Sequence, residues 1–248
     1  MNRFAPVLSF AAALLAWQIV VSALRVPPYL VPGPWAIGAA FAADPVGLLQ
    51  ALLATLSVTA ASLVAACAAG VALACAMAAS PWARAFLKPW AVILQVTPVV
   101  AVAPLIVVWV GDPFLAMTLC ATIVAFFPVF ANTAAGLEAT PSELLDLFRL
   151  SGATRTQEIL LLRLPAALPY FLAGVRVSGG LALVGAVVAE FVTGAGGVAS
   201  GLAFRILEAG YRLQVPRMFA CLALLSAAGL AINAALGALS GAVLARRG

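Results

Sequence analysis

The stretch Asp146–Pro165, DLFRLSGATRTQEILLLRLP, is a polar island in a chain that is otherwise almost entirely apolar. Asp146 stands six residues before Gly152, nine residues follow, and then come Leu162 and Leu164-Pro165. Short charged helices broken by a glycine are hard to explain as part of a membrane span. The stretch is easier to explain as a surface that another protein binds.

The composition around this stretch excludes a water-soluble domain. The chain is 65% hydrophobic and only 8% charged, whereas a soluble domain carries about 25% charged residues. The long segments without charge are 4–24, 45–83, 89–111, 113–137 and 218–245. Each is long enough to cross a bilayer as a helix. None shows the alternation of a barrel strand, so the sequence predicts an all-α integral membrane protein.

Six spans fit the hydrophobic pattern, within a single transmembrane domain that covers residues 1–248. We expect them at about 5–24, 51–79, 90–111, 114–134, 166–190 and 216–244. The second is longer than a bilayer requires, which predicts a tilted helix or one that extends past the membrane. The first exceeds the 7–15 apolar residues of a signal peptide, so we interpret it as a retained span.

Basic residues in the loops predict that both termini are cytoplasmic. With the N-terminus inside, the inner side holds Arg3, Arg84, Lys88, Arg149, Arg155, Arg163, Arg246 and Arg247. The outer side holds Arg25, Arg205, Arg212 and Arg217. We expect short helices in two outer segments, near 35–43 and within 191–215. The net charge of +5 fits loops that face anionic lipid, and no nucleic acid is expected as a partner.

The residue types present argue against catalysis. The chain has no histidine, which excludes imidazole metal sites and histidine-based catalysis. Its four cysteines form no metal-binding spacing, and we interpret them as packing residues. Lys88 is the only lysine, and no phosphate-binding glycine loop accompanies it. We therefore expect no catalytic residue, metal or cofactor in this chain, and an energy source outside it.

Polar residues within the spans are candidates for a translocation pathway, because such groups are costly in lipid and often functional. The candidates are Gln95, Thr97, Asn132 and Ser178. Each has an alternative role as an interhelical hydrogen-bonding group. Glu190, at the outer end of the fifth span, is a candidate for an outer gate or a contact with an external protein; a helix-capping or interfacial role is the alternative.

Prolines interrupt the third and fourth spans, at Pro98, Pro104 and Pro128. A proline removes a backbone hydrogen bond and kinks a helix. The kinks are either structural or mark helices that bend as a pathway opens.

Residues 135–165 form the longest inner loop, with signals for two short helices. Thr140 and Glu143 suit a capping box, with Pro141 at the first helical position. Gly152 suits the left-handed position that ends this helix. Thr154 with Gln157 offers a second capping box, for a helix expected to end before Pro165.

This helical pair has two interpretations. It can rest on lipid as an amphipathic hairpin, or it can dock in a groove of another protein. Its three arginines are offset by Glu138, Glu143, Asp146 and Glu158. A lipid anchor prefers bases with few acids, so the mixed charge favours a protein groove.

The loop resembles the cytoplasmic loop of binding-protein-dependent ABC importer permeases. That family's pattern is an EAA triplet, a glycine four residues after it, nine residues, and then I-x-L-P. Asp146-Leu147-Phe148 stands at the triplet, Gly152 at the glycine, Leu162 at the isoleucine and Leu164-Pro165 at the end. Aspartate keeps the charge of the glutamate, while Leu147 and Phe148 replace small alanines.

Other segments resemble the sulfonate, taurine and nitrate branch of this family. They are Thr97-Pro98 followed by residues 103–109, and residues 164–169 leading to Ala189-Glu190. The resemblance covers roughly residues 50–240, the expected permease core. It implies a type I importer fold in a bacterial cytoplasmic membrane, with the 135–165 loop as the coupling loop.

The resemblance also implies partners. These are a second copy of the chain, two ATPase subunits that bind ATP and magnesium, and an external solute-binding protein. The residues expected to contact the ATPase subunit are Glu143, Asp146, Leu147, Phe148, Arg149, Ser151, Gly152, Ala153 and Thr154. The implied function is a pathway for a small nutrient, organic or an oxyanion.

Two other classes of membrane protein fit the sequence less well than the importer. An intramembrane enzyme needs a catalytic set within the spans, and none is present. A stand-alone carrier driven by protons or sodium should show intramembrane acids or repeated broken helices, and neither is evident. The sequence does not identify the transported substrate.

Overall fold

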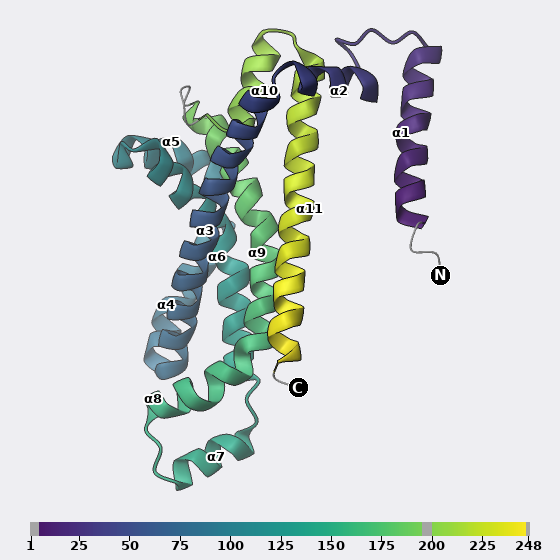
Figure 1. Ribbon diagram of the computed structural model, residues 1–248. Helices are drawn as coiled ribbons and strands as arrows, with labels where there is room; N and C mark the ends of the chain where they lie inside the picture. The colour runs from purple at the N-terminus through teal and green to yellow at the C-terminus, as the bar shows by residue number, and fades with distance from the viewer. Residues whose placement is uncertain (1–4, 195–199, 247–248) are drawn as a thin grey trace. The chain divides into compact units, whose positions relative to one another are not determined.

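The computed structural model describes residues 5–194 and 200–246, and within these it is entirely helical (Figure 1). The helices, in chain order, are α1 (Ala5–Ala23), α2 (Pro34–Ala43), α3 (Pro45–Ala79), α4 (Pro81–Val96), α5 (Val99–Val110), α6 (Pro113–Glu138), α7 (Ser142–Leu150), α8 (Arg155–Gln157), the π-helical segment η1 (Glu158–Arg163), α9 (Leu164–Thr193), α10 (Leu202–Tyr211) and α11 (Val215–Ala245). The short helices expected near 35–43 and within 191–215 are present as α2 and α10.

Four helical segments are long and apolar enough to cross a membrane: α3, α6, the run Arg155–Thr193 that ends with α9, and α11. The pair α4 and α5 is a fifth candidate if it counts as one broken span, whereas α1 and α2 are shorter apolar helices. With 35 residues, α3 is about 52 Å long at 1.5 Å per residue. It exceeds a hydrocarbon core of about 30 Å, as the overlong second span predicted.

The third span predicted over 90–111, with kinks at its prolines, is broken into two helices rather than kinked within one. The chain forms two helices there, α4 and α5, bent by 101° at a break. Thr97 adopts an extended conformation, with φ −71° and ψ 120°. The physical reason is Pro98, which lacks an N–H and disfavours the helical conformation in the residue before it.

The chain divides into two compact units, and α3 and α11 contribute residues to both. The first unit comprises Met1–Thr55 and Ala195–Ala227. Its core contains Leu48 and Ala51 of α3, Leu202 and Ile206 of α10, and Cys221 of α11. Two polar contacts support it. Asp44 pairs with Arg217 at 2.5 Å, and the Thr55 hydroxyl accepts the Leu202 N–H at the start of α10, at 2.9 Å.

The second unit comprises Leu56–Gly194 and Ala228–Gly248, and its core is the seam between α6 and α9. Small residues allow the two helix backbones to approach closely. A methyl group at Gly174 would lie 2.7 Å from the Pro128 carbonyl oxygen, and one at Gly185 would lie 2.8 Å from the Ala121 Cα. Close helix contact through small residues is the usual packing in membranes, where lipid provides little hydrophobic drive.

We expect Gly174→Ala to lower the free energy of unfolding by about 1–3 kcal/mol, the usual range for overpacking. The added methyl would meet the backbone of α6, which cannot move aside like a flexible side chain. Gly180→Ala on the same helix is the matched control, because nothing lies within 4 Å of its added methyl. Thermal unfolding in detergent measures both variants, and equal melting temperatures would contradict the close seam.

Candidate functional site

The loop between α6 and α9 carries α7 beyond the ends of both helices, as Figure 1 shows. Three leucines of α7 are exposed: Leu144 by 44%, Leu147 by 61% and Leu150 by 87%. The charged residues Glu143, Asp146 and Arg149 alternate with them along the helix. A short amphipathic helix with an uncovered apolar face is suited to a hydrophobic groove.

The two ends of α7 differ in how well local rules predicted them. The Thr140 capping box is wrong. The helix is preceded by Pro141, and the Thr140 hydroxyl instead donates to the Leu137 carbonyl at 3.5 Å. With Pro141 itself at the N-cap, Thr140 lies one residue too early to cap. The C-terminal end is confirmed, because Gly152 takes φ +79° and its N–H donates to the Arg149 carbonyl at 3.0 Å.

The second capping box, formed by Thr154 and Gln157, is confirmed in both directions. The expected helix end before Pro165 is wrong, because the chain continues from α8 through η1 into α9. In η1 the hydrogen bonds span five residues, and the Leu164 N–H bonds to the Ile159 carbonyl. Pro165 then falls in the first turn of α9, where a missing N–H does not break the helix.

A chain of ion pairs joins α7 to the base of α9. Arg163 Nη2 donates to Glu158 Oε1, and Arg149 Nε donates to Glu158 Oε2 at 3.4 Å. Arg149 also pairs with Asp146 at 3.5 Å. The Glu158 side chain is only 4% exposed, whereas that of Asp146 is 69% exposed. The buried carboxylate is therefore the centre of the network, because buried pairs are screened less than exposed ones.

Arg155 adds a second link from the loop to the helices. Its Nη2 donates to the Ala78 carbonyl, near the C-terminal end of α3, at 3.3 Å. A cation at this end of a helix is favourable because the last carbonyls lack partners. The turn 151–154 and α8 are thus attached at two points rather than loosely tethered.

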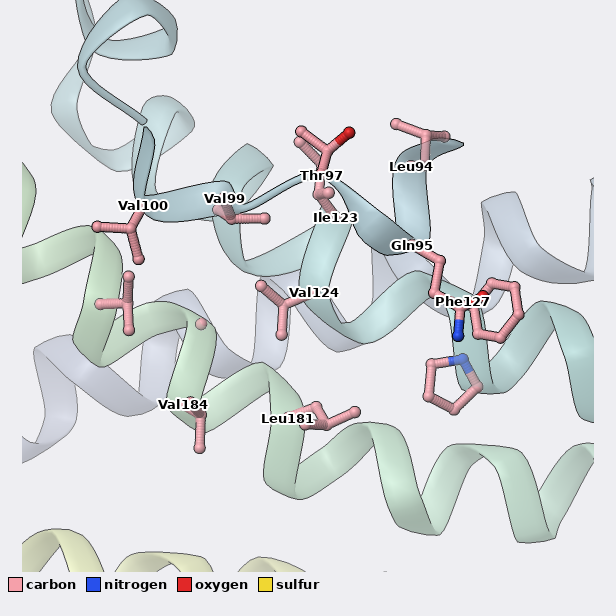
Figure 2. A pocket seen from close by; sticks show the side chains of 13 residues that line it. Leu94, Gln95, Thr97, Val99, Val100, Ile123, Val124, Phe127, Leu181 and Val184 are labelled. Carbon is pink, nitrogen blue, oxygen red and sulfur yellow. The ribbon is translucent and has the colours of Figure 1, made fainter. Parts of the chain in front are cut away.

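A pocket of about 410 Å³ lies at the break between α4 and α5. In Figure 2, Val124 and Phe127 of α6 and Leu181 and Val184 of α9 lie across from this break. The lining also includes two of the predicted pathway residues, Gln95 and Thr97. The Thr97 hydroxyl donates to the Ile93 carbonyl at 2.7 Å, while the Gln95 side chain extends toward Phe127 (Figure 2).

The other pathway candidates are not part of this pocket lining. Asn132 donates to the Pro128 carbonyl in its own helix at 2.8 Å. Ser178 is buried and donates to the Ala125 carbonyl of α6 at 2.6 Å. Glu190 is buried near the end of α9 and is 3% exposed. The pocket lining therefore includes Gln95 and Thr97 but not Asn132, Ser178 or Glu190.

The family model for the inner membrane component of binding-protein-dependent transport systems matches residues 66–246. The chain belongs to this permease family. The resemblance of the 135–165 loop is thereby confirmed at the level of the family. This permease is the inner-membrane component of an ABC transport system and crosses the membrane several times.

Several permeases are similar to this one over most of their length. A probable ABC transporter permease protein of Haemophilus influenzae is 34% identical over 227 residues, which are 92% of this chain and 91% of that protein. The riboflavin transport system permease protein RibX of Chloroflexus aurantiacus is 38% identical over 215 residues, 86% of this chain and 79% of that protein. The taurine transport system permease protein TauC of Escherichia coli is 27% identical over 225 residues, 88% of this chain and 80% of that protein.

Family membership defines the permease's role in broad terms. Permease subunits are not catalytic, and a separate ATPase subunit hydrolyses ATP. A binding-protein-dependent system also includes a solute-binding protein. The stand-alone carrier, the alternative that the sequence left open, is therefore excluded.

Sequence reasoning missed the pairing of Glu158 with Arg163 in this permease. The two residues are five positions apart, and in an α-helix facing pairs are three or four apart. Only the π-helical η1 brings them together. An acid and a base five apart just before a proline was the one signal available, and it is a weak one.

Proposed function

We propose that two copies of this permease form the membrane pathway of an ATP-driven importer, with residues 135–165 of each copy docked on an ATPase subunit. Each copy would cross the membrane six times, with α1 as the first span and the α4–α5 pair as the third, and with both termini in the cytoplasm. Residues 50–240 would form the permease core. The orientation rests partly on Arg3 and Arg247, which lie outside the described residues.

The exposed leucines of α7 are the observation that carries this proposal. Outside the predicted spans, a row of uncovered leucines is unfavourable in water, at about 25 cal/mol per Å² of apolar surface. A groove on the ATPase subunit would cover Leu144, Leu147 and Leu150. The contact set is the one expected from the sequence, Glu143, Asp146, Leu147, Phe148, Arg149, Ser151, Gly152, Ala153 and Thr154, all in α7 or in the turn after it. ATP and magnesium would bind in the ATPase subunit.

The pocket at the α4–α5 break supports a pathway between two copies. Gln95 is exposed in the single chain, and an amide that faces hydrocarbon is costly. Irregular backbone at membrane depth is tolerated only where protein covers it or where it lines a water-filled cavity. A second copy across this face would cover both the Gln95 amide and the irregular backbone at the break. Asn132, Ser178 and Glu190 remain candidates for the pathway or its outer gate.

The substrates in the names of these relatives belong to two chemical classes, heteroaromatic compounds and a sulfonate. RibX is a riboflavin permease and a Halalkalibacterium halodurans relative is a formylaminopyrimidine permease, whereas TauC is a taurine permease. We therefore propose a small organic nutrient as the substrate, delivered by the solute-binding protein.

We expect Leu147→Asp to abolish co-purification of the ATPase subunit with the permease. Placing a charge in an apolar groove costs several kcal/mol unless it is paired, about the range seen for buried unpaired polar groups. The measurement is the ratio of ATPase to permease after affinity purification in detergent, together with ATP-dependent uptake in proteoliposomes.

Leu30→Asp is the control, because Leu30 is equally exposed, at 61%, but lies in the first unit, far along the chain from α7. It should leave the subunit ratio unchanged. Normal assembly of the Leu147→Asp variant would show that α7 is not the docking helix.

A further inference from the structure

The pocket at the α4–α5 break has a lining that disfavours charged ligands. All of its lining side chains are neutral, and most are branched aliphatic residues from α5, α6 and α9. Arg176 of α9 is not part of the lining. Its guanidinium donates instead to Asn233 of α11 at 3.1 Å. The lining that one copy supplies therefore offers an anion no cation to pair with, and burying an unpaired charge is strongly unfavourable.

The backbone at the break offers both donors and acceptors. Pro98 has no N–H, so the Leu94 carbonyl lacks the donor that a continuous helix would supply. Val99 and Val100 begin α5, and among the described residues their N–H groups have no acceptor. Free acceptors at the end of α4 thus lie next to free donors at the start of α5.

These two helix ends also oppose each other electrostatically. The C-terminal end of α4 carries a partial negative charge and the N-terminal end of α5 a partial positive charge. Because only Thr97 and Pro98 separate them, their fields largely cancel for a bound ion. The separate hydrogen-bond donors and acceptors remain available to the polar edge of an uncharged ligand.

Gln95 and Phe127 complete the recognition chemistry. The Gln95 amide can donate and accept at once, and in Figure 2 it extends toward the Phe127 ring. An aromatic ring and an amide in the same pocket lining suit a flat ligand that stacks through its face and hydrogen-bonds through its edge. The volume of about 410 Å³ lies in the range of small-molecule sites, about 300–1,000 Å³.

We propose that this pocket is a solute-binding site for an uncharged heteroaromatic compound whose edge carries both hydrogen-bond donors and acceptors. The site excludes sulfonates, nitrate and other oxyanions. This inference rests on the proposed function, since it places the pocket on the pathway. It adds a substrate class, and it assigns Gln95 as the residue that hydrogen-bonds to the polar edge of the ligand.

The test is direct binding to the full permease–ATPase complex in nanodiscs, without nucleotide and without the solute-binding protein. The probes are lumichrome, an uncharged fluorescent heteroaromatic ring system, and naphthalene-2-sulfonate, an aromatic anion. We expect saturable lumichrome binding that Gln95→Leu weakens about tenfold, the effect of one lost polar contact. Gln50→Leu, at an exposed position in α3 outside the lining, is the matched control and should change the affinity by less than about twofold.

The sulfonate should show no saturable binding that depends on Gln95. The inference is overturned if the sulfonate binds in a Gln95-dependent manner, if lumichrome binding ignores Gln95→Leu, or if neither probe binds saturably. This assay uses no ATP and does not depend on α7. A failure of the Leu147→Asp test would therefore remove the docking proposal and leave this result interpretable on its own.

Discussion

Gly152→Pro is expected to lower ATP-driven uptake by the reconstituted importer about tenfold or more, while the ATPase subunit keeps its basal activity. Gly152 has φ +79°, whereas proline requires φ near −65°. Proline also removes the N–H that donates to the Arg149 carbonyl at 3.0 Å. Such a substitution costs about 3 kcal/mol or more in a helix, and each 1.4 kcal/mol corresponds to a factor of about ten.

The size of this effect follows from what the turn has to transmit. Shifting a two-state gate from 1:99 to 99:1 requires about 5.5 kcal/mol. A turn that is disordered cannot pass that free energy from an ATPase subunit to α9. Gly152 has nothing within 4 Å of an added Cβ, so the strain comes from the backbone conformation and not from a clash.

A graded series at Gly152 separates backbone strain from loss of folding. Gly152→Asn should retain most uptake, because asparagine tolerates the left-handed conformation. Gly152→Val should fall between asparagine and proline, because a β-branched residue is strained there. The measurements are uptake into proteoliposomes and ATP hydrolysis by the same preparation. Unchanged uptake in Gly152→Pro would show that this turn does not couple the two subunits.

Local rules predicted the middle of the loop, residues 152–157, well. The left-handed Gly152 and the Thr154–Gln157 capping box depend only on residues three or four apart, and both are present. The same rules failed for the third span, because hydropathy registers apolar length and says nothing about direction. The sequence predicts a kink at Pro98, but a 101° bend depends on how the flanking helices pack.

The pocket-lining residues could likewise be predicted only in part from the sequence. Gln95 and Thr97 are predicted pathway residues because they are polar groups within a span, and the structure places both at the helix break. Asn132 and Ser178 meet the same criterion, yet their side chains donate to the carbonyls of Pro128 and Ala125, and neither residue lines the pocket. Polarity alone cannot distinguish these cases, because the distinction depends on which helix lies opposite.

The buried Glu158 leads to the second large effect. Glu158→Ala is expected to lower the free energy of unfolding by about 3–5 kcal/mol, because it leaves the Arg163 guanidinium buried without its partner. Arg163 has a side-chain exposure of 11%, so water cannot replace the carboxylate. Asp146→Ala is the control, since this exposed acid should contribute less than about 1 kcal/mol. Denaturation in detergent measures both variants, and equal losses would contradict a buried centre of the network.

Stability and coupling can then be separated within the same ion-pair network. Glu158→Leu combined with Arg163→Met replaces the buried pair with apolar side chains of similar size. Such replacements are often neutral or stabilising, so the double variant should regain most of the stability lost in Glu158→Ala. It still lacks the carboxylate that Arg149 of α7 contacts at 3.4 Å. We therefore expect uptake to remain low although the protein is stable, because α7 is no longer attached to the base of α9. Full recovery of uptake would mean that Glu158 serves folding alone.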